Sequence, residues 1–219
     1  QEFRKLAESG EFSQGNGTVT EVDIHTPYKE YFLKHFKFKK KFKVVVDSGN
    51  GTGGIVNPGI IRSLGHDVIE LYSEPDSRFP NHHPDPTVEK NLKDIIEKVK
   101  ETKADVGFAY DGDADRIGVI DEKGGIIWGD KLMILFAREI LERKGKGTFV
   151  AEVKCSQTFY DDVRKRGGNA VMWKAGHSLI KQKMKETGAD LGGEMSGHIF
   201  FRDRYFGYDD ALYASCRTL

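Results

Sequence analysis

The sequence predicts an α/β protein made of two consecutive three-layer α/β/α domains with mixed, mostly parallel sheets. Two observations lead to this fold class. Short runs of β-branched residues alternate with segments of helical period, which favours parallel strands joined by crossover helices. The alternation starts at Lys43, stops at a glycine hairpin over residues 122–125 and starts again at Asp130. A chain of 219 residues suits one or two such domains.

The composition excludes several classes of protein. Hydrophobic residues make up 38% of the chain and charged residues 31%, so the chain can form a core, unlike a disordered protein. The 34 basic and 34 acidic side chains balance, which argues against a nucleic-acid partner. No apolar run approaches the ~18 residues of a membrane span, so no membrane partner is expected. The two cysteines, Cys155 and Cys216, form no disulfide framework, which favours a cytoplasmic protein.

Two helices are expected before the first sheet. Phe3 and Leu6 lie at helical spacing, and Gly10 ends that helix. Residues 19–24 then suggest a short extended segment. The second helix begins at Thr26, which we expect to be its N-cap because a proline follows at the first helical position.

The elements of the first domain follow from hydrophobic patterning. Residues 44–46 are three valines without polar alternation, as in a strand buried on both faces. Further strands are expected at 67–71 and 105–110, and the intervening apolar residues recur at helical spacing. The turn 122–125 contains two glycines between apolar runs, which predicts an antiparallel hairpin at the sheet edge.

The second domain repeats this pattern. Asp130 is expected to cap its first helix, whose apolar positions recur every three or four residues up to Leu141. The remaining elements are expected as strands at 148–153, 170–173 and 199–201, with helices around 158–163 and 180–184.

A glycine-rich turn, residues 49–54, follows the first strand and opens a helix. It satisfies the pattern GxGxxG, and Glu70 lies near the end of the next strand, as in dinucleotide-binding folds. Backbone N–H groups in such a turn can bind an anion. The same glycines also suit a tight turn that needs positive φ angles. An NAD-linked oxidoreductase using Gly49 to Gly54 is therefore one functional hypothesis.

A second motif, Asp-Gly-Asp-Ala-Asp-Arg at residues 111–116, follows a buried strand. Its alternation places Asp111, Asp113 and Asp115 on one side of an extended loop, where the carboxylates repel each other unless a cation binds. An all-oxygen ligand set favours Mg²⁺. An EF-hand fits less well, because Arg116 occupies the position that requires glycine and the flanks are strands. An arginine beside a metal also provides a fork for phosphate.

Polar residues also follow the strands of the second domain. Lys174 and His177 follow the strand at 170–173 and place a cation and an imidazole at the edge where open α/β sheets bind ligands. In the glycine-bracketed loop 192–198, Glu194, Ser196 and His198 alternate and would point the same way if the loop is extended. A carboxylate beside a hydroxyl suits vicinal sugar hydroxyls, which both donate and accept hydrogen bonds. Capping of the following helix and an ordinary turn are the simpler alternatives for these two segments.

Together these motifs resemble the α-D-phosphohexomutase family through nearly the whole chain. Residues 111–116 look like the metal loop of that family, and 193–198 look like its sugar-recognition loop. Met195 within this loop is similar to the bacterial phosphomannomutase/phosphoglucomutase branch. Residues 79–86 and 153–156 also look like family signatures.

The resemblance implies a phosphosugar mutase that interconverts mannose or glucose 1-phosphate with the 6-phosphate through an enzyme phosphoserine and a bisphosphorylated intermediate. Asp111, Asp113 and Asp115 would hold one Mg²⁺, and Arg116 would act in catalysis by neutralising charge on the phosphoryl oxygens. A hexose 1,6-bisphosphate activator is expected for the full-length enzyme.

The resemblance also assigns the remaining cleft residues. Glu194 and Ser196 would bind sugar hydroxyls, and His198 would line the same cleft. Lys154 and His177 would bind substrate and act in catalysis, either of them serving in proton transfer.

The family has four domains, so the resemblance divides this chain into the end of domain 1 with a linker (1–22), domain 2 (23–125) and an incomplete domain 3 (126–219). The family's phosphoserine loop, Thr-Ala-Ser-His-Asn-Pro, does not occur in the sequence, and domain 4 is missing. The missing domains 1 and 4 of the same enzyme are therefore expected partners, and the chain is expected to be inactive alone. A non-catalytic module that binds sugar phosphates is the second alternative to the mutase.

Overall fold

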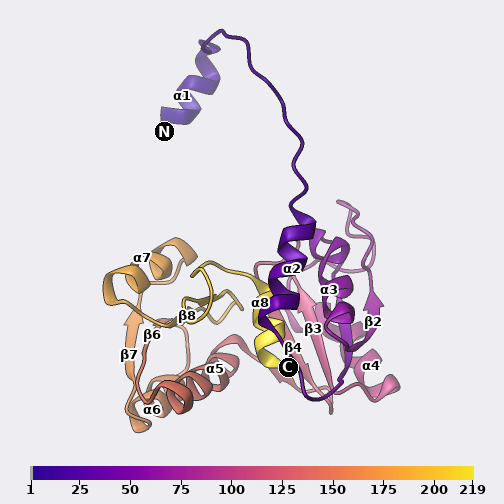
Figure 1. Ribbon diagram of the computed structural model, residues 1–219, viewed down its shortest axis with the longest axis vertical. Coiled ribbons are helices and arrows are strands. Elements are labelled where there is room, and N and C mark those ends of the chain that lie inside the picture. Colours follow the sequence, from indigo (N-terminus) through magenta and orange to yellow (C-terminus); the bar gives the residue numbers. More distant parts are fainter. Residues whose placement is uncertain (1) are drawn as a thin grey trace.

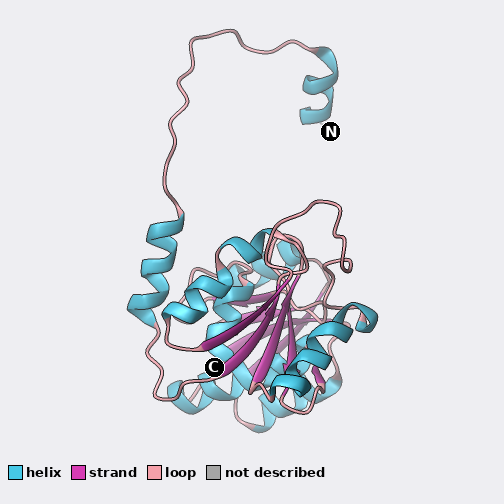
Figure 2. Cartoon of the chain, turned by 90° about the vertical axis from the view of Figure 1, so that its right-hand side faces the viewer, coloured by secondary structure: helices cyan, strands magenta, loops and turns pink. Residues whose placement is uncertain are grey.

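The computed structural model describes residues 2–219, which form two α/β units and an N-terminal arm (Figure 1). The first unit contains a five-stranded sheet of order β2-β1-β3-β4-β5, and the second a four-stranded sheet of order β7-β6-β8-β9. Helices flank the strands on both sides (Figure 2). The predicted fold class, two α/β domains with mixed and mostly parallel sheets, is confirmed.

The first unit begins with a helix and then alternates strand and helix. Its elements are α2 (His25–His35), β1 (Lys43–Asp47), the 3₁₀ helix η1 (Thr52–Ile55), α3 (Asn57–Ser63), β2 (Asp67–Leu71), the 3₁₀ helix η2 (Glu89–Leu92), α4 (Lys93–Thr102), β3 (Val106–Tyr110), β4 (Ile117–Asp121) and β5 (Ile126–Ile127). Strand β1 pairs in parallel with β2 and β3, whereas β4 runs antiparallel to β3. Strand β5 pairs antiparallel with β4 and completes the sheet of the first unit at Ile127.

The second unit has the same strand plan. Its elements are α5 (Gly129–Lys144), β6 (Thr148–Glu152), α6 (Gln157–Lys165), β7 (Asn169–Trp173), α7 (His177–Thr187), β8 (Leu191–Gly193), β9 (Ile199–Phe201) and α8 (Ala211–Thr218). Strand β6 pairs in parallel with β7 and β8, and β9 runs antiparallel to β8. The sequence analysis missed β8, whose two glycines it assigned to a loop. Gly192 is needed there because a Cβ would lie 2.4 Å from the sulfur of Met184.

Two helix starts differ from the expected ones. Helix α2 begins before Thr26, and the Asp23 carboxylate accepts hydrogen bonds from the N–H groups of His25 and Thr26. Asp130 does not cap α5 but is buried inside its first turn, where it accepts a hydrogen bond from the N–H of Ser156. Asp23, and not the expected Thr26, therefore binds the first N–H groups of α2, and Asp130 does not lie at the N-cap position expected for it.

Each unit has its own core on its outer face. In the first unit, Val45 of β1 packs with Ile95 and Val99 of α4. In the second, Val150 of β6 packs with Ile180 of α7. Burial of these apolar side chains removes them from water, which is the main favourable term in folding.

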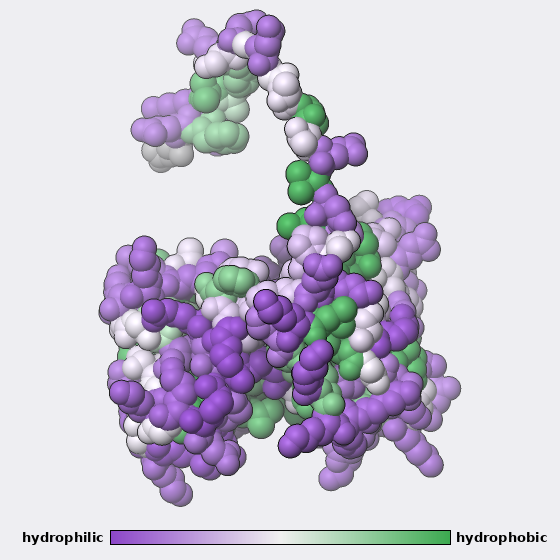
Figure 3. All heavy atoms as spheres, in the orientation of Figure 1, coloured by the Kyte–Doolittle hydropathy of each residue, from purple (hydrophilic) through white to green (hydrophobic). Residues whose placement is uncertain are grey.

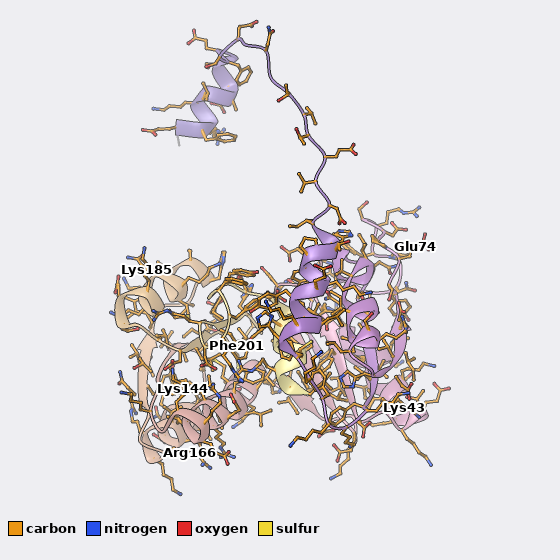
Figure 4. The ribbon with its side chains drawn as sticks, viewed as in Figure 1. Lys43, Glu74, Lys144, Arg166, Lys185 and Phe201 are labelled. Atoms are coloured by element: carbon orange, nitrogen blue, oxygen red, sulfur yellow. The ribbon has the colours of Figure 1, made fainter. Side chains whose placement is uncertain are left out.

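A third core is shared between the inner faces of the two units. Helix α8 contacts both β4 and β9, and Phe201 and Tyr213 belong to the same buried cluster as Phe108. The buried Tyr110 of β3 and Ser215 of α8 are joined by a 2.8 Å hydrogen bond. Figure 4 shows Phe201 between the units and Arg166 at the outer surface. The two units are therefore packed against each other through one continuous core.

The N-terminal arm consists of α1 (Glu2–Ser9) and the following residues up to α2, which extend away from both units (Figures 1 and 2). Its apolar side chains are exposed, as Figure 3 shows, and Val19 is 98% accessible. Residues 19–24, expected as a short extended segment, belong to no strand of either sheet, and Ile24 has helical backbone angles. None of the helices within residues 2–219 has the length and apolar character needed to cross a membrane.

Candidate active site

The metal-loop candidate, residues 111–116, connects β3 to β4. It is a tight turn rather than the extended loop expected from the alternation. The N–H of Ala114 bonds to the carbonyl of Asp111 at 3.2 Å, and Ala114 has a φ angle of +60°. The turn nevertheless brings Asp111, Asp113 and Asp115 together, with one oxygen from each lying within 4.8 Å of the others. The three carboxylates therefore converge, but a turn rather than an extended loop brings them together.

This donor set fits a hard divalent cation. Carboxylate oxygens are the ligands that Mg²⁺ prefers in proteins, and the cluster contains three of them. Asp111 is buried, and burial raises its pKa to about 6 against the hydrogen bonds that Arg116 donates. A buried anion close to two others is costly without a counter-charge. Strands β3 and β4 flank the turn, so an EF-hand, which needs flanking helices, does not form.

Arg116 is fixed between two carboxylates. Its Nε donates to Asp111 at 2.7 Å, and its Nη1 lies 3.3 Å from the carboxylate of Asp85. Asp85 belongs to the motif at 79–86 and is itself held by the hydroxyl of Thr87 at 2.7 Å. Nη2 of Arg116 makes no hydrogen bond within residues 2–219, which leaves one arm of the guanidinium fork for another anion.

The sugar-loop candidate, residues 194–198, connects β8 to β9 and is also a turn. The N–H of Glu194 bonds to the carbonyl of His198 at 3.0 Å. The Glu194 carboxylate accepts the N–H of Gly176 at 2.5 Å, at the N-terminus of α7, and lies 2.9 Å from Nδ1 of His198. Ser196 Oγ is 3.1 Å from the same nitrogen. The helix N-terminus and the imidazole outweigh burial and lower the pKa of Glu194.

The two loops meet and form one site. Nε2 of His198 is 3.1 Å from the Asp115 carboxylate. The N–H of Ile117 donates to the carbonyl of Gly197 at 3.1 Å, so the backbones are joined as well. Although burial opposes the charged form, hydrogen bonds to Asp115 and Glu194 raise the pKa of His198 to about 9. The imidazolium therefore links the metal loop to the sugar loop.

Lys154 and His177 lie near this junction. The Lys154 side chain is 63% exposed, and its Nζ is 3.3 Å from the Glu152 carboxylate. The His177 ring stacks on that of His198 with centroids 5.7 Å apart, and its Nδ1 is 3.5 Å from Asp209. His177 is the first residue of α7, and its N-cap is Gly176, so neither His177 nor the following serine caps the helix.

A cavity of about 340 Å³ borders the metal loop on the side of α2 and α8. Its walls include Tyr28, Asn57, Asp113 and Asp209. Polar side chains thus face both the metal loop and the start of the last helix, and space for a polar ligand adjoins the three aspartates.

The glycine-rich turn 49–54 is used for packing. The N–H of Thr52 donates to the carbonyl of Gly112 at 2.9 Å, and that of Gly51 to Ser48 at 2.7 Å, so these groups already have partners. A Cβ on Gly54 would lie 2.0 Å from the carbonyl oxygen of Ser73. These contacts favour the structural role of the glycines over a pyrophosphate cradle, because the turn supports the metal loop directly.

Three residues of the site were not singled out in the sequence. Asp85 holds Arg116, Asp209 faces His177, and Glu152 lies beside Lys154. Asp85 lies within the motif at 79–86, and Glu152 directly precedes the motif at 153–156, so their positions in the sequence could have indicated them. Asp209 carries no such signal, because the turn that brings it to the site is defined only by tertiary packing.

Comparison with known proteins identifies the family to which this fold belongs. The family "Phosphoglucomutase/phosphomannomutase, alpha/beta/alpha domain II" matches residues 26–125, and domain III of the same family matches residues 128–219. The chain belongs to the phosphoglucomutase/phosphomannomutase family. The resemblance inferred from the motifs is thereby confirmed.

Several relatives within this family are close. The chain is 48% identical over 219 residues to the phosphomannomutase/phosphoglucomutase of Pseudomonas aeruginosa, matching 100% of this chain and 47% of that protein. It is 44% identical over 221 residues to a phosphoglucomutase of Neisseria meningitidis, matching 48% of that protein. The chain therefore spans about half the length of the curated phosphohexomutases it matches.

A solved structure supports the same assignment. A phosphoglucomutase/phosphomannomutase family protein of Burkholderia thailandensis superposes with a TM-score of 0.93 at 44% identity, covering 98% of this chain and 47% of the other. A more distant Thermus thermophilus protein, described as a putative phosphomannomutase, superposes with a TM-score of 0.82 at 22% identity and shows the fold alone.

Proposed function

We propose that the complete protein interconverts the 1-phosphates and 6-phosphates of glucose and mannose. The sugar hydroxyl attacks the phosphorus of an enzyme phosphoserine, the bond from phosphorus to serine oxygen breaks, and a hexose bisphosphate forms. After the intermediate reorients, serine attacks its other phosphate and releases the product. The phosphoserine is supplied by a segment outside this chain. The proposal is supported by the names of the relatives and by the contact of His198 with both Asp115 and Glu194.

Some residues of this chain position the substrate, and others neutralise the charge of the transferring phosphoryl group. Asp111, Asp113 and Asp115 would hold Mg²⁺, which when bound supplies charge neutralisation at the transferring phosphoryl group. The Nη2 group of Arg116 donates hydrogen bonds to the phosphoryl oxygens. In phosphoryl transfer this kind of positioned charge accounts for most of the catalysis.

The second unit binds the sugar. Glu194 and Ser196 receive its hydroxyls, and His198 keeps them beside the metal loop. Lys154 and His177 hold substrate beside the sugar loop, and either can accept or return the proton of the attacking hydroxyl. The unpaired, buried Cys155 and Cys216 are consistent with the reducing cytoplasm in which we place this reaction.

The test is a coupled mutase assay on the complete protein, with glucose 1-phosphate or mannose 1-phosphate, Mg²⁺ and a catalytic amount of a hexose 1,6-bisphosphate. We expect 6-phosphate from both sugars. Binding of sugar phosphate without turnover would instead indicate a binding module. Nicotinamide binding seen by cofactor fluorescence, without mutase turnover, would indicate an oxidoreductase.

A further inference from the structure

Glu152 is a buried carboxylate for which the mechanism above has no role. It is the last residue of β6, and its side chain is only 1% exposed. A buried carboxylate is costly unless charged or hydrogen-bonding partners surround it. Its position must therefore be supported by the groups that it touches.

One oxygen of Glu152 holds the sugar loop. Oε1 accepts a 2.8 Å hydrogen bond from the backbone N–H of Met195, the residue between Glu194 and Ser196. The Glu152 backbone is itself anchored, since its carbonyl accepts the hydroxyl of Tyr160 at 2.7 Å. The loop is thus fastened to the end of a central strand rather than to another loop.

The other oxygen faces Lys154. Oε2 is buried and has no hydrogen bond of normal geometry within residues 2–219, and the Nζ of Lys154 lies 3.3 Å from it. The lysine side chain is otherwise mostly exposed at the mouth of the site. The attraction of the buried carboxylate favours, among the many rotamers of a long exposed side chain, the one that keeps the ammonium beside the sugar loop.

We propose that Glu152 is a positioning residue that fixes the sugar loop with one carboxylate oxygen and the Lys154 ammonium with the other. Both groups would then keep a fixed distance from the bound sugar phosphate, because a single rigid strand end holds them. Glu152 itself touches no substrate. This inference rests on the proposed mutase function.

The test is a double-mutant cycle on the complete protein in the coupled mutase assay. Glu152→Gln keeps the side-chain volume and an acceptor for the Met195 N–H but removes the charge that holds Lys154. We expect kcat/KM for glucose 1-phosphate to fall about tenfold or more. In a Lys154→Met background, the same substitution should have almost no further effect, because the group through which Glu152 acts is already gone.

Asp130→Asn is the matched control. Asp130 is also a buried acid near this turn and accepts a hydrogen bond from the N–H of Ser156, but within residues 2–219 no hydrogen bond or ion pair joins it to Lys154 or to residues 194–198. We expect its melting temperature to change while kcat/KM stays within about twofold of the unmodified protein. A purely structural role for Glu152 would make the two variants behave alike.

Two results would overturn the inference. They are an unchanged kcat/KM in Glu152→Gln, and losses that simply multiply in the double variant. If Glu152→Gln melts below the assay temperature, the same cycle is measured at a lower temperature at which that variant is folded, and the same criterion of additivity applies. Absence of turnover in the unmodified protein would instead refute the mutase function, so the two failures are distinguishable.

Discussion

The two α/β units share a strand plan but carry different side chains in the corresponding loop. Each has three parallel strands followed by one antiparallel strand, β4 in the first unit and β9 in the second. The metal loop 111–116 and the sugar loop 194–198 occupy the same place in this plan, between the third parallel strand and the antiparallel one. The first loop carries only carboxylates as candidate ligands, whereas the second combines a carboxylate, a hydroxyl and an imidazole.

The comparison explains why the two loops form one site. Arg116 and His198 form an isolated antiparallel bridge, so the antiparallel strands of the two units meet at their starts. Ligands in open α/β sheets bind beyond the carboxyl ends of parallel strands, and here two such edges are joined through residues 116–117 and 197–198. In our proposal, the first unit therefore supplies the carboxylates for the metal and the second supplies the residues for the sugar.

Removing a charge from the metal loop should cause the largest loss. Asp113→Asn leaves the fold intact, because Asp113 is exposed, but removes one of three anionic ligands. We expect Mg²⁺-dependent kcat in the complete protein to fall about a thousandfold, in keeping with the several kcal/mol that a bound cation contributes. Titration of kcat with Mg²⁺ measures this. Asp121→Asn, in the hairpin of the same unit, is the control, and an unchanged Mg²⁺ dependence in Asp113→Asn would refute the metal assignment.

Removing the acid of the sugar loop should cost less. Glu194→Ala deletes a carboxylate that sits at the N-terminus of α7 and, in our proposal, binds two sugar hydroxyls. We expect a loss of about 2–3 kcal/mol in kcat/KM, for both glucose and mannose phosphates, because the 3- and 4-hydroxyls are the same in both. Steady-state kinetics with each sugar measure it. A loss confined to one sugar would mean that Glu194 reads the 2-position instead.

Much of this comparison was visible in the sequence. The strand at 44–47 follows from three consecutive valines and the strand at 67–71 from its apolar residues, and the spacing of the carboxylates at 111–115 marked them as a cluster, although it did not predict the turn that brings them together. Local patterns of this kind depend on a few neighbouring residues, so sequence analysis finds them. The family motifs then indicated residues 193–198 as the second loop of the site, and His198 of this loop contacts Asp115.

The parts that were missed depend on packing between distant segments. Strand β8 contains two glycines that no propensity would place in a strand, and they are tolerated because Met184 fills the space above Gly192. The turn at Ala114 replaces the expected extended loop because its backbone bonds back to Asp111. Asp85 reaches Arg116 across 31 residues of chain, which local reasoning cannot detect.

The contact between the two loops can be tested through Gly197. Its φ angle is +96°, and an added Cβ would lie 2.4 Å from the carbonyl oxygen of Ile117. We expect Gly197→Ala to destabilise the protein by about 2 kcal/mol, because the backbone at residue 197 is strained and the start of β4 at Ile117 is displaced. Gly145→Ala is the control, since it has a φ angle of +72° but no atom near the added Cβ. It should cost only about 1 kcal/mol. Thermal unfolding compares the two, and equal melting temperatures would contradict a close contact between the loops.

The smallest expected effect concerns the acidic residue at the end of the first strand in each unit. Each first parallel strand ends in a buried acid, Asp47 in β1 and Glu152 in β6. Glu152 faces a lysine, whereas Asp47 lies 3.0 Å from Nε2 of His82. Histidine is the side chain that ordinarily titrates between pH 5 and 8, so a pH-dependent contribution to stability is expected at this position in the first unit.

The sign follows from the pKa of His82, which the hydrogen bond to Asp47 raises despite the opposing effect of burial. The folded state therefore favours the protonated imidazole. This stabilisation is fully present below the unfolded-state pKa of about 6.5 and is lost as the pH rises through the higher folded-state pKa. Because the imidazole is only partly shielded from solvent, we expect it to contribute no more than about 0.5–1 kcal/mol. Urea unfolding should show that His82→Gln destabilises the protein more at pH 5.5 than at pH 9. In an Asp47→Asn background this difference between the two pH values should vanish, and its persistence there would show that another group, not Asp47, sets the pKa of His82.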